Sequence, residues 1–270
     1  MKRILVVNDD GINAPGLLAL AKAVKDLGEV KIVAPREQRT GWGVSITLFR
    51  PLRVENFSLD GLDAYVVDGT PADCAILGIG SIFSEKPDIV LSGYNSGANL
   101  SQMAVPSSGT IGAAIEAAMD GIPAVAFSFE VPSLKEAMEE RSTQIDYERV
   151  RDMVRHLTCC ILETGLPVGA DLLSICIPAT VSPQTDLEFT RLAPPLYRKE
   201  VVRGTDPYGI PYYWIKVTQE EEGIWEVGTD VHCLFGGGRI SITPLSLDAT
   251  AKIEKGTLEE FIGRVQTARP

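Results

Sequence analysis

Histidine is scarce in this sequence, and its cysteines do not occur in ligand-like pairs. The 270 residues include only two histidines, His156 and His232, and five cysteines with no C-x-x-C spacing. A zinc centre built from His and Cys ligands is therefore not expected, and the odd number of cysteines predicts no disulfide framework. We expect the thiols to be reduced, as they are in the cytoplasm.

Positive charge and long apolar runs are also limited. Lys and Arg number 25 against 36 Asp and Glu, which gives a formal net charge of -11. Such an acidic chain is not expected to bind a nucleic-acid polymer or an anionic membrane through its overall charge. We expect no leader before the first strand, and the sequence has no apolar run of membrane-spanning length, so we expect a cytoplasmic protein with no membrane partner.

The sequence begins with a β-α-β pattern but lacks a dinucleotide-binding fingerprint. Two short β-branched runs, Ile4 to Val7 and Val30 to Ala34, flank a helix-forming stretch from Leu17 to Val24. This pattern predicts parallel strands joined by a right-handed crossover. No G-x-G-x-x-G motif follows the first strand, which argues against a nicotinamide-dependent reductase.

Later segments extend this pattern to an α/β fold with a mainly parallel sheet flanked by helices. Further strands are expected at 88–92, 124–128 and 172–177, with helices at 74–82, 111–119 and 147–162. From about residue 183 the pattern changes to a hairpin (197–203 and 211–217), a late strand (239–242) and a terminal helix (253–265). We therefore predict a catalytic core at 1–182 and an extension at 183–270.

Polar side chains follow the predicted strands where each of them ends. Asp9 and Asp10 come directly after the first strand, while Thr40 and Asn95 lie in loops that follow two other strands. Because the carboxyl ends of parallel strands form the ligand-binding edge of such sheets, we expect these loops to converge. Their oxygen donors suit Mg²⁺, Mn²⁺ or Ca²⁺, with water or substrate completing the coordination. The alternative is that Asn8 to Gly11 is an ordinary polar turn.

Ser108, Gly109 and Thr110 precede and open a predicted helix. The first turn of a helix presents free N–H groups, so this segment is a candidate phosphate cradle. The alternative is a plain N-cap, which Ser and Thr supply in many helices. Asn99 is either a turn former or a ligand contact.

Nine short motifs are spread over nearly the whole chain. They are Asn8 to Gly11, Val33 to Pro35, Ser45 to Thr47, Gly69 to Cys74, Ser92 to Asn99, Ser108 to Thr110, Asp206 to Gly209, Tyr212 to Ile215 and Ser241 to Leu245. In sequence and in order they resemble the motifs of the SurE family, the stationary-phase survival proteins, which are 5'(3')-nucleotidases.

The resemblance implies a Rossmann-like core with a C-terminal extension. It implies one divalent metal ion per subunit, Mg²⁺ or Mn²⁺ with Ca²⁺ as a substitute in crystals, held by Asp9, Asp10, Thr40 and Asn95. It also implies hydrolysis of nucleoside monophosphates, often with broader phosphatase or exopolyphosphatase activity. Members form homodimers or homotetramers with exchanged C-terminal segments, which agrees with the projecting hairpin expected here.

Three residues of the second strand-end loop bear on this resemblance. Thr40 replaces the usual Ser of the family and keeps its hydroxyl, although the added methyl group restricts χ1. Val44 stands where the family often has a polar residue, so one side chain that could contact phosphate or water is missing. Trp42 adds bulk that would either stack on a base or pack.

These observations lead us to expect a metal-dependent phosphomonoesterase, a 5'-nucleotidase that releases phosphate from nucleoside 5'- and 3'-monophosphates. Asp9 and Asp10 would hold the ion, and one of them or Asn8 would orient the attacking water. Attack by an Asp carboxylate on phosphorus is ranked lower, because both carboxylates are needed for the ion. The alternatives are a broad-specificity acid phosphatase or exopolyphosphatase, and a nucleotide-binding protein with weak catalysis.

Overall fold

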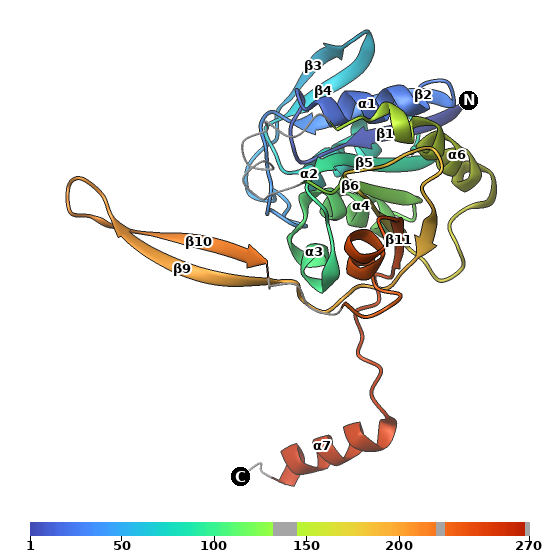
Figure 1. Ribbon diagram of the computed structural model, residues 1–270. Coiled ribbons are helices and arrows are strands. Elements are labelled where there is room, and N and C mark those ends of the chain that lie inside the picture. The colour runs from blue at the N-terminus through green and yellow to red at the C-terminus, as the bar shows by residue number, and fades with distance from the viewer. Residues whose placement is uncertain (132–144, 220–224, 268–270) are drawn as a thin grey trace.

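A nine-stranded, mainly parallel sheet forms the centre of the protein (Figure 1). The computed structural model describes residues 1–131, 145–219 and 225–267. Across the sheet the strands run β3-β4-β2-β1-β5-β6-β7-β11-β8. Their bounds are β1 Lys2–Val7, β2 Gly28–Pro35, β3 Val54–Leu59, β4 Leu62–Val67, β5 Ile89–Ser96, β6 Ala124–Phe129, β7 Leu172–Ile177, β8 Leu187–Phe189 and β11 Ile240–Leu245.

Helices cover both faces of this sheet. The helical elements are α1 Pro15–Val24, α2 Pro71–Leu77, η1 Gly78–Ile82, α3 Ser101–Ser107, α4 Gly109–Met119, α6 Glu148–Thr164, η2 His232–Gly236 and α7 Lys255–Thr267. Alternate residues of β1 enter two separate cores because successive strand side chains point to opposite faces. Ile4 and Val6 pack with α1 and α6, whereas Leu5 and Val7 pack with α2 and α4. This three-layer α/β arrangement confirms the predicted fold class.

The connectivity places a topological switch point between β1 and β5. From β1 the chain crosses to β2 on one side, and the later strands β5, β6 and β7 extend the sheet on the other side. All pairings among β2, β1, β5, β6 and β7 are parallel. In open α/β sheets, ligands bind in the crevice at the carboxyl ends of the strands, beside such a switch point.

A two-stranded antiparallel hairpin projects from the main body (Figure 1). It consists of β9 Tyr197–Thr205 and β10 Pro211–Gln219, paired in register from Tyr197 with Gln219 to Thr205 with Pro211. The Asp206 carboxylate stabilises its turn by accepting bonds from the backbone N–H groups of Tyr208 at 2.9 Å and Ile210 at 2.8 Å. The predicted hairpin is therefore confirmed. The terminal helix α7 lies at the end of an extended segment that follows β11 (Figure 1).

Several elements differ from the sequence-based expectation. The helix expected from Cys74 already begins at Pro71, where Thr70 forms a capping box with Asp73, and it ends in the π-helical turn η1. The short helix α3 was not predicted, because it contains Pro106. The proposed boundary at about residue 183 stays a prediction, and strands from both sides of it share the main sheet.

Candidate functional site

The segment Asn8–Gly11 leaves the sheet at the carboxyl end of β1, beside the switch point. Gly11 has φ +98, a left-handed conformation that lets the chain turn at once. The Asn8 side-chain amide donates to the carbonyl of Gly11 at 3.0 Å and so closes this turn. Asn8 and Asp9 are both buried, so the turn presents polar groups below the protein surface.

The carboxylate of Asp9 is held at the beginning of α4. The Thr110 hydroxyl donates to Asp9 Oδ1 at 2.6 Å, and the backbone N–H of Thr110 also bonds to this carboxylate. Gly109 allows this close approach, since a Cβ there would lie 2.7 Å from Asp9 Cβ. Burial raises the pKa of Asp9, while the bonds from Thr110 act in the opposite direction. The site therefore contains a desolvated carboxyl group that a nearby cation would keep ionised.

Asp10 connects the first and third strand-end loops. Its Oδ2 accepts the backbone N–H of Ser96 at 3.2 Å, and its Oδ1 lies 3.4 Å from Nε2 of Gln38. The neighbouring Asn95 is buried, and its amide nitrogen donates to the carbonyl of Gly97 at 2.6 Å. The amide oxygen of Asn95 is thus the atom that remains to bind a cation or water.

The loop after β2 lies across this edge of the sheet. Its Arg39 N–H donates to the carbonyl of Asp9 at 2.7 Å, and its Gly43 N–H donates to the carbonyl of Ser107 at 3.2 Å. The loop is therefore attached at two points beside Asp9 and the start of α4. Thr40, the predicted metal ligand, follows Arg39 and is exposed.

Trp42 lies in the same loop and is 47% exposed. The guanidinium carbon of Arg39 lies 4.8 Å from the centre of its indole ring, a cation–π arrangement. One face of the ring is thus covered by Arg39. Val44, two residues further on, is also exposed, so its apolar side chain faces solvent.

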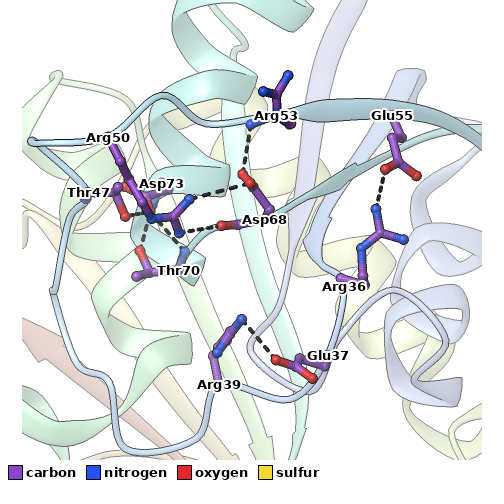
Figure 2. A network of polar contacts seen from close by, with 10 residues as sticks. All are labelled: Arg36, Glu37, Arg39, Thr47, Arg50, Arg53, Glu55, Asp68, Thr70 and Asp73. Atoms are coloured by element: carbon purple, nitrogen blue, oxygen red, sulfur yellow. Dashed lines mark hydrogen bonds and ion pairs between the residues drawn. The ribbon is translucent and has the colours of Figure 1, made fainter.

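A network of polar contacts holds the segment that follows this loop (Figure 2). Asp73 of α2 accepts the N–H of Thr47 at 2.8 Å and its hydroxyl at 2.6 Å, while Asp68 binds Arg50 and the backbone of Arg53. Two ion pairs complete the network, between Arg36 and Glu55 and between Arg39 and Glu37. These contacts fix both ends of the loop relative to the sheet.

The remaining predicted residues lie around this centre. The Ser108 hydroxyl accepts the N–H of Ile111 at 3.1 Å and so acts as the N-cap of α4. The Asn99 backbone N–H donates to the Ser128 hydroxyl at 3.1 Å, and its side-chain nitrogen is buried without a hydrogen-bond partner among the described residues. The structure therefore brings Asp9 together with Thr110, and Asp10 with the loop of Asn95. The roles of these residues in binding stay predictions.

A cavity of about 260 Å³ opens beside Asp10. It lies between the turn that leads into α1 and the segment after β2. The residues that line it are Asp10, Gly11, Asn13, Ala14, Pro15, Gly16, Arg36, Glu37, Gln38 and Ser96.

Sequence reasoning missed two side chains close to Asp10. Gln38 approaches its carboxylate directly, and Tyr147 of the segment before α6 bonds to the side chain of Ser96. Burial raises the pKa of the Tyr147 hydroxyl, with the charge of Asp10 adding to this effect. Gln38 follows a strand end, which is a signal that was present in the sequence, whereas Tyr147 reaches the site from the segment before α6, far along the chain, and has no local signal.

Neither histidine belongs to this centre. His156 is an exposed residue of α6 whose Nδ1 lies 2.6 Å from the carbonyl of Asp152, and His232 belongs to η2. Among the described residues, no three His, Cys, Asp or Glu side chains gather in a cluster that would bind a metal. A cation at Asp9 and Asp10 would therefore depend on amide, hydroxyl and water oxygens as well. Across residues 1–131, 145–219 and 225–267, no helix has both the length and the apolarity to cross a membrane.

Three comparisons with known proteins point to one family. The family model described as "Survival protein SurE" matches residues 4–199. A protein of Methanothrix thermoacetophila named "5'-nucleotidase SurE" is 44% identical over 267 residues, which cover 97% of this chain and 99% of the relative. A relative of the same name from Methanosarcina barkeri is 44% identical over 268 residues, with 96% and 97% covered. The crystal structure of the SurE protein from Aquifex aeolicus superposes with a TM-score of 0.76 at 34% identity and covers 98% of this chain and 99% of that one.

Proposed function

The chain belongs to the SurE family and is a 5'-nucleotidase, and we propose that it releases phosphate from nucleoside 5'- and 3'-monophosphates with the help of one divalent metal ion. The observation that supports this most directly is the position of Asp9 and Asp10 at the switch point of the parallel sheet, each fixed by a contact from another element. A pair of oriented carboxylates at this edge is the arrangement that binding of a hard cation requires.

The residues present fit such an ion. Asp9 is 2% exposed, and a buried carboxylate is costly unless a positive charge or several donors offset it. Asn8 Oδ1 is also buried and accepts no hydrogen bond from the part of the chain that the structure describes. Asp9, Asp10, Asn95 and Thr40 would hold Mg²⁺ or Mn²⁺ through oxygen atoms, which are the ligands these ions prefer. When bound, the ion supplies Lewis-acid polarisation of the phosphoryl group and a more acidic water.

The protein's own side chains and the amino end of α4 would position the carboxylates, the phosphoryl group and the attacking water. Thr110 holds Asp9 by its hydroxyl and backbone N–H, and Ser96 holds Asp10 by its backbone N–H. The amino end of α4, at Ser108 to Thr110, carries the positive end of the helix dipole and would offset the charge of the phosphoryl group. Asn8, Asp9 or Asp10 would orient the water for attack on phosphorus, opposite the leaving oxygen.

The test is phosphate release from AMP with and without a chelator, comparing the wild type with Asp10→Asn. We expect chelation to abolish activity, Mg²⁺ or Mn²⁺ to restore it, and Asp10→Asn to lower kcat/KM by at least about 100-fold, a loss typical of removing one electrostatic contact to a transition state. Asp152→Asn is the matched control, because Asp152 is an exposed carboxylate of α6 with 77% of its side chain accessible. Equal rates with and without chelator would refute the metal-dependent mechanism.

We also propose that the protein works as a homodimer or homotetramer with exchanged C-terminal segments. Exposed aromatic and aliphatic side chains on the hairpin and on α7 support this, among them Trp214, Ile215 and Phe261. The helix α7 buries none of its residues within one chain.

We also propose a reducing, cytoplasmic location. The five cysteines are free, which fits this proposal.

A further inference from the structure

We propose that Tyr147 positions Asp10 for metal binding by acting through Ser96, an inference that rests on the proposed metal-dependent nucleotidase function. The Asp10 carboxylate accepts the backbone N–H of Ser96 at 3.2 Å, and the side chain of Ser96 is hydrogen-bonded in turn to the hydroxyl of Tyr147. Asp10 follows β1, Ser96 ends β5 and Tyr147 is the N-cap residue of α6, so these contacts join three elements. Tyr147 is therefore a positioning residue, separated from the proposed metal ligand by one residue.

The ring of Tyr147 is fixed by aromatic packing. It stacks on Tyr94 with ring centroids 5.4 Å apart and an angle of 6° between the planes, and it meets Phe129 edge-on at 5.4 Å and 89°. Tyr94 and Phe129 also meet edge-on, at 5.3 Å, and each is 1% exposed. Stacked and edge-to-face arrangements are the geometries that aromatic pairs prefer. The Tyr147 ring thus has a defined place against β5 and β6, and its hydroxyl is held in place with it.

Gly16 leaves room for this hydroxyl at the start of α1. A Cβ at Gly16 would lie 3.3 Å from the hydroxyl oxygen of Tyr147 and 2.5 Å from the carbonyl oxygen of Tyr94. Any side chain at this position would therefore press on both residues. The polar end of Tyr147 is enclosed where α1, the end of β5 and the start of α6 meet, and the Ser96 side chain is its hydrogen-bond partner there.

An irregularity in β5 explains why a side-chain contact matters at Ser96. The pairing of β5 with β6 shifts register between Ser92 and Asn95, so the ladder is irregular immediately before Ser96. Beyond Ser96 the chain turns at Gly97, which has φ +139. Since such a bulge re-aims the residues beside it, the direction of the Ser96 N–H toward Asp10 depends on contacts outside the ladder. Groups that orient a metal ligand also tune the affinity of the site, so loss of the Tyr147 hydroxyl should affect metal binding.

Tyr147→Phe tests the proposal, because it keeps the stacked ring and removes only the hydroxyl. Ser96→Ala removes the other half of the same hydrogen bond and keeps the backbone N–H that Asp10 accepts, and a double variant combines both changes. Tyr65→Phe is the matched control, since it removes the hydroxyl of a half-buried tyrosine in β4, which is separated from β1 by β2. The measurements are the dissociation constant for Mn²⁺ by calorimetric titration without substrate, and kcat and KM for phosphate release from AMP at saturating Mn²⁺. Thermal unfolding first establishes that each variant is folded.

We expect Tyr147→Phe to weaken Mn²⁺ binding by about three- to tenfold, below the roughly 10–100-fold loss that is typical when a direct partner of a metal ligand is removed. The value of kcat should fall by a similar factor, while KM for AMP stays within about twofold of the wild type. Ser96→Ala should show the same loss, and the double variant should bind Mn²⁺ as well as Ser96→Ala does, because both changes remove one hydrogen bond. Tyr65→Phe should match the wild type.

Unchanged Mn²⁺ affinity in Tyr147→Phe, or losses that multiply in the double variant, would overturn the positioning role. A wild type that binds Mn²⁺ but releases no phosphate from AMP refutes the proposed nucleotidase function, and the Mn²⁺ titrations still decide the positioning role. A wild type that binds no Mn²⁺ refutes the proposed metal site and the positioning role together.

Discussion

Asp9 illustrates how one residue of the site depends on another that is far away in the sequence. Its carboxylate is buried, and the hydroxyl of Thr110, 101 positions further on, donates to it at 2.6 Å. From the sequence, Thr110 was predicted to be part of a phosphate cradle, a role that stays a prediction. Its bond to Asp9 could not be predicted, because local sequence does not show which strand end a helix will face.

Thr110→Val tests the structural part of this contact. The substitution keeps the shape of the side chain and removes the hydroxyl, so Asp9 Oδ1 loses a buried donor. We expect the free energy of unfolding to fall by about 1–3 kcal/mol, the usual cost of leaving a buried polar group unpaired, and kcat for AMP to fall as Asp9 loses its fixed orientation. Thr110→Ser retains the hydroxyl and should lie near the wild type in denaturant unfolding and phosphate release. Equal losses in both variants would contradict this account.

Asp230 is a second buried carboxylate whose hydrogen bonds join segments that are far apart in the sequence. It is buried and accepts the backbone N–H groups of Ser101 at 2.7 Å, Ala193 at 2.8 Å and Val231 at 2.9 Å. These bonds join the start of α3 to two segments of the C-terminal part. Asp230→Asn places an amide N–H against one of the three donors, so we expect it to lower the free energy of unfolding by about 1–3 kcal/mol, measured by urea denaturation at constant pH.

The Asp230 carboxyl group should also make the free energy of unfolding depend on pH. Burial raises the pKa of Asp230 above the ordinary value of 3.8, with its backbone hydrogen bonds acting in the opposite direction. The folded state then binds this proton more tightly than the unfolded chain. The resulting stabilisation is present below pH 3.8 and is lost as the pH rises through the raised pKa. The free energy of unfolding of the wild type relative to that of Asp230→Asn should therefore fall as the pH rises from this point, as measured by unfolding curves of both proteins at each pH.

At the scale of elements, the strands were predicted well and the connections poorly. The buried runs of β1, β2 and β7 have lengths and compositions that identify them, and β7 was predicted at its observed bounds, Leu172–Ile177. The turn between β3 and β4 is formed by Asp60 and Gly61, both with positive φ, so an available hairpin signal was overlooked. The position of the loop after β2 over α4 depends on backbone contacts with Ser107, which no local pattern reveals.

Gly43→Ala tests whether the attachment of this loop matters for the site. Gly43 has φ +57, and a Cβ there would lie 2.3 Å from the carbonyl oxygen of Pro106. The loop must shift away from α3 and α4, so we expect a clear fall in kcat/KM for AMP together with lower thermal stability. Gly41→Ala is the matched control, since Gly41 also has a positive φ of +83 but no atom within 4 Å of the added Cβ. Similar kcat/KM values for the two variants would argue against a role for the contact.

At the scale of the whole molecule, the hairpin and α7 expose more apolar surface than a monomer usually presents. Leu258, Phe261, Ile262 and Val265 are all exposed on α7, and Trp214 and Ile215 are exposed on β10. Phe261→Asp should therefore weaken assembly and shift the mass measured by light scattering toward that of one chain. Gln266→Asp adds the same charge to an exposed polar position of α7 and should leave the mass unchanged. A wild type that is monomeric at micromolar concentration would refute the proposed oligomer.

The place of β11 in the sheet has a consequence for biosynthesis. This strand lies between β7 and β8, although more than sixty residues separate it from the end of β7 in the sequence. While the chain is still being made on the ribosome, β7 therefore presents an open edge of unpaired N–H and C=O groups, which is a template for pairing with another chain. Until about residue 245 has left the exit tunnel, β11 cannot pair with β7, and that edge stays open to association with other chains.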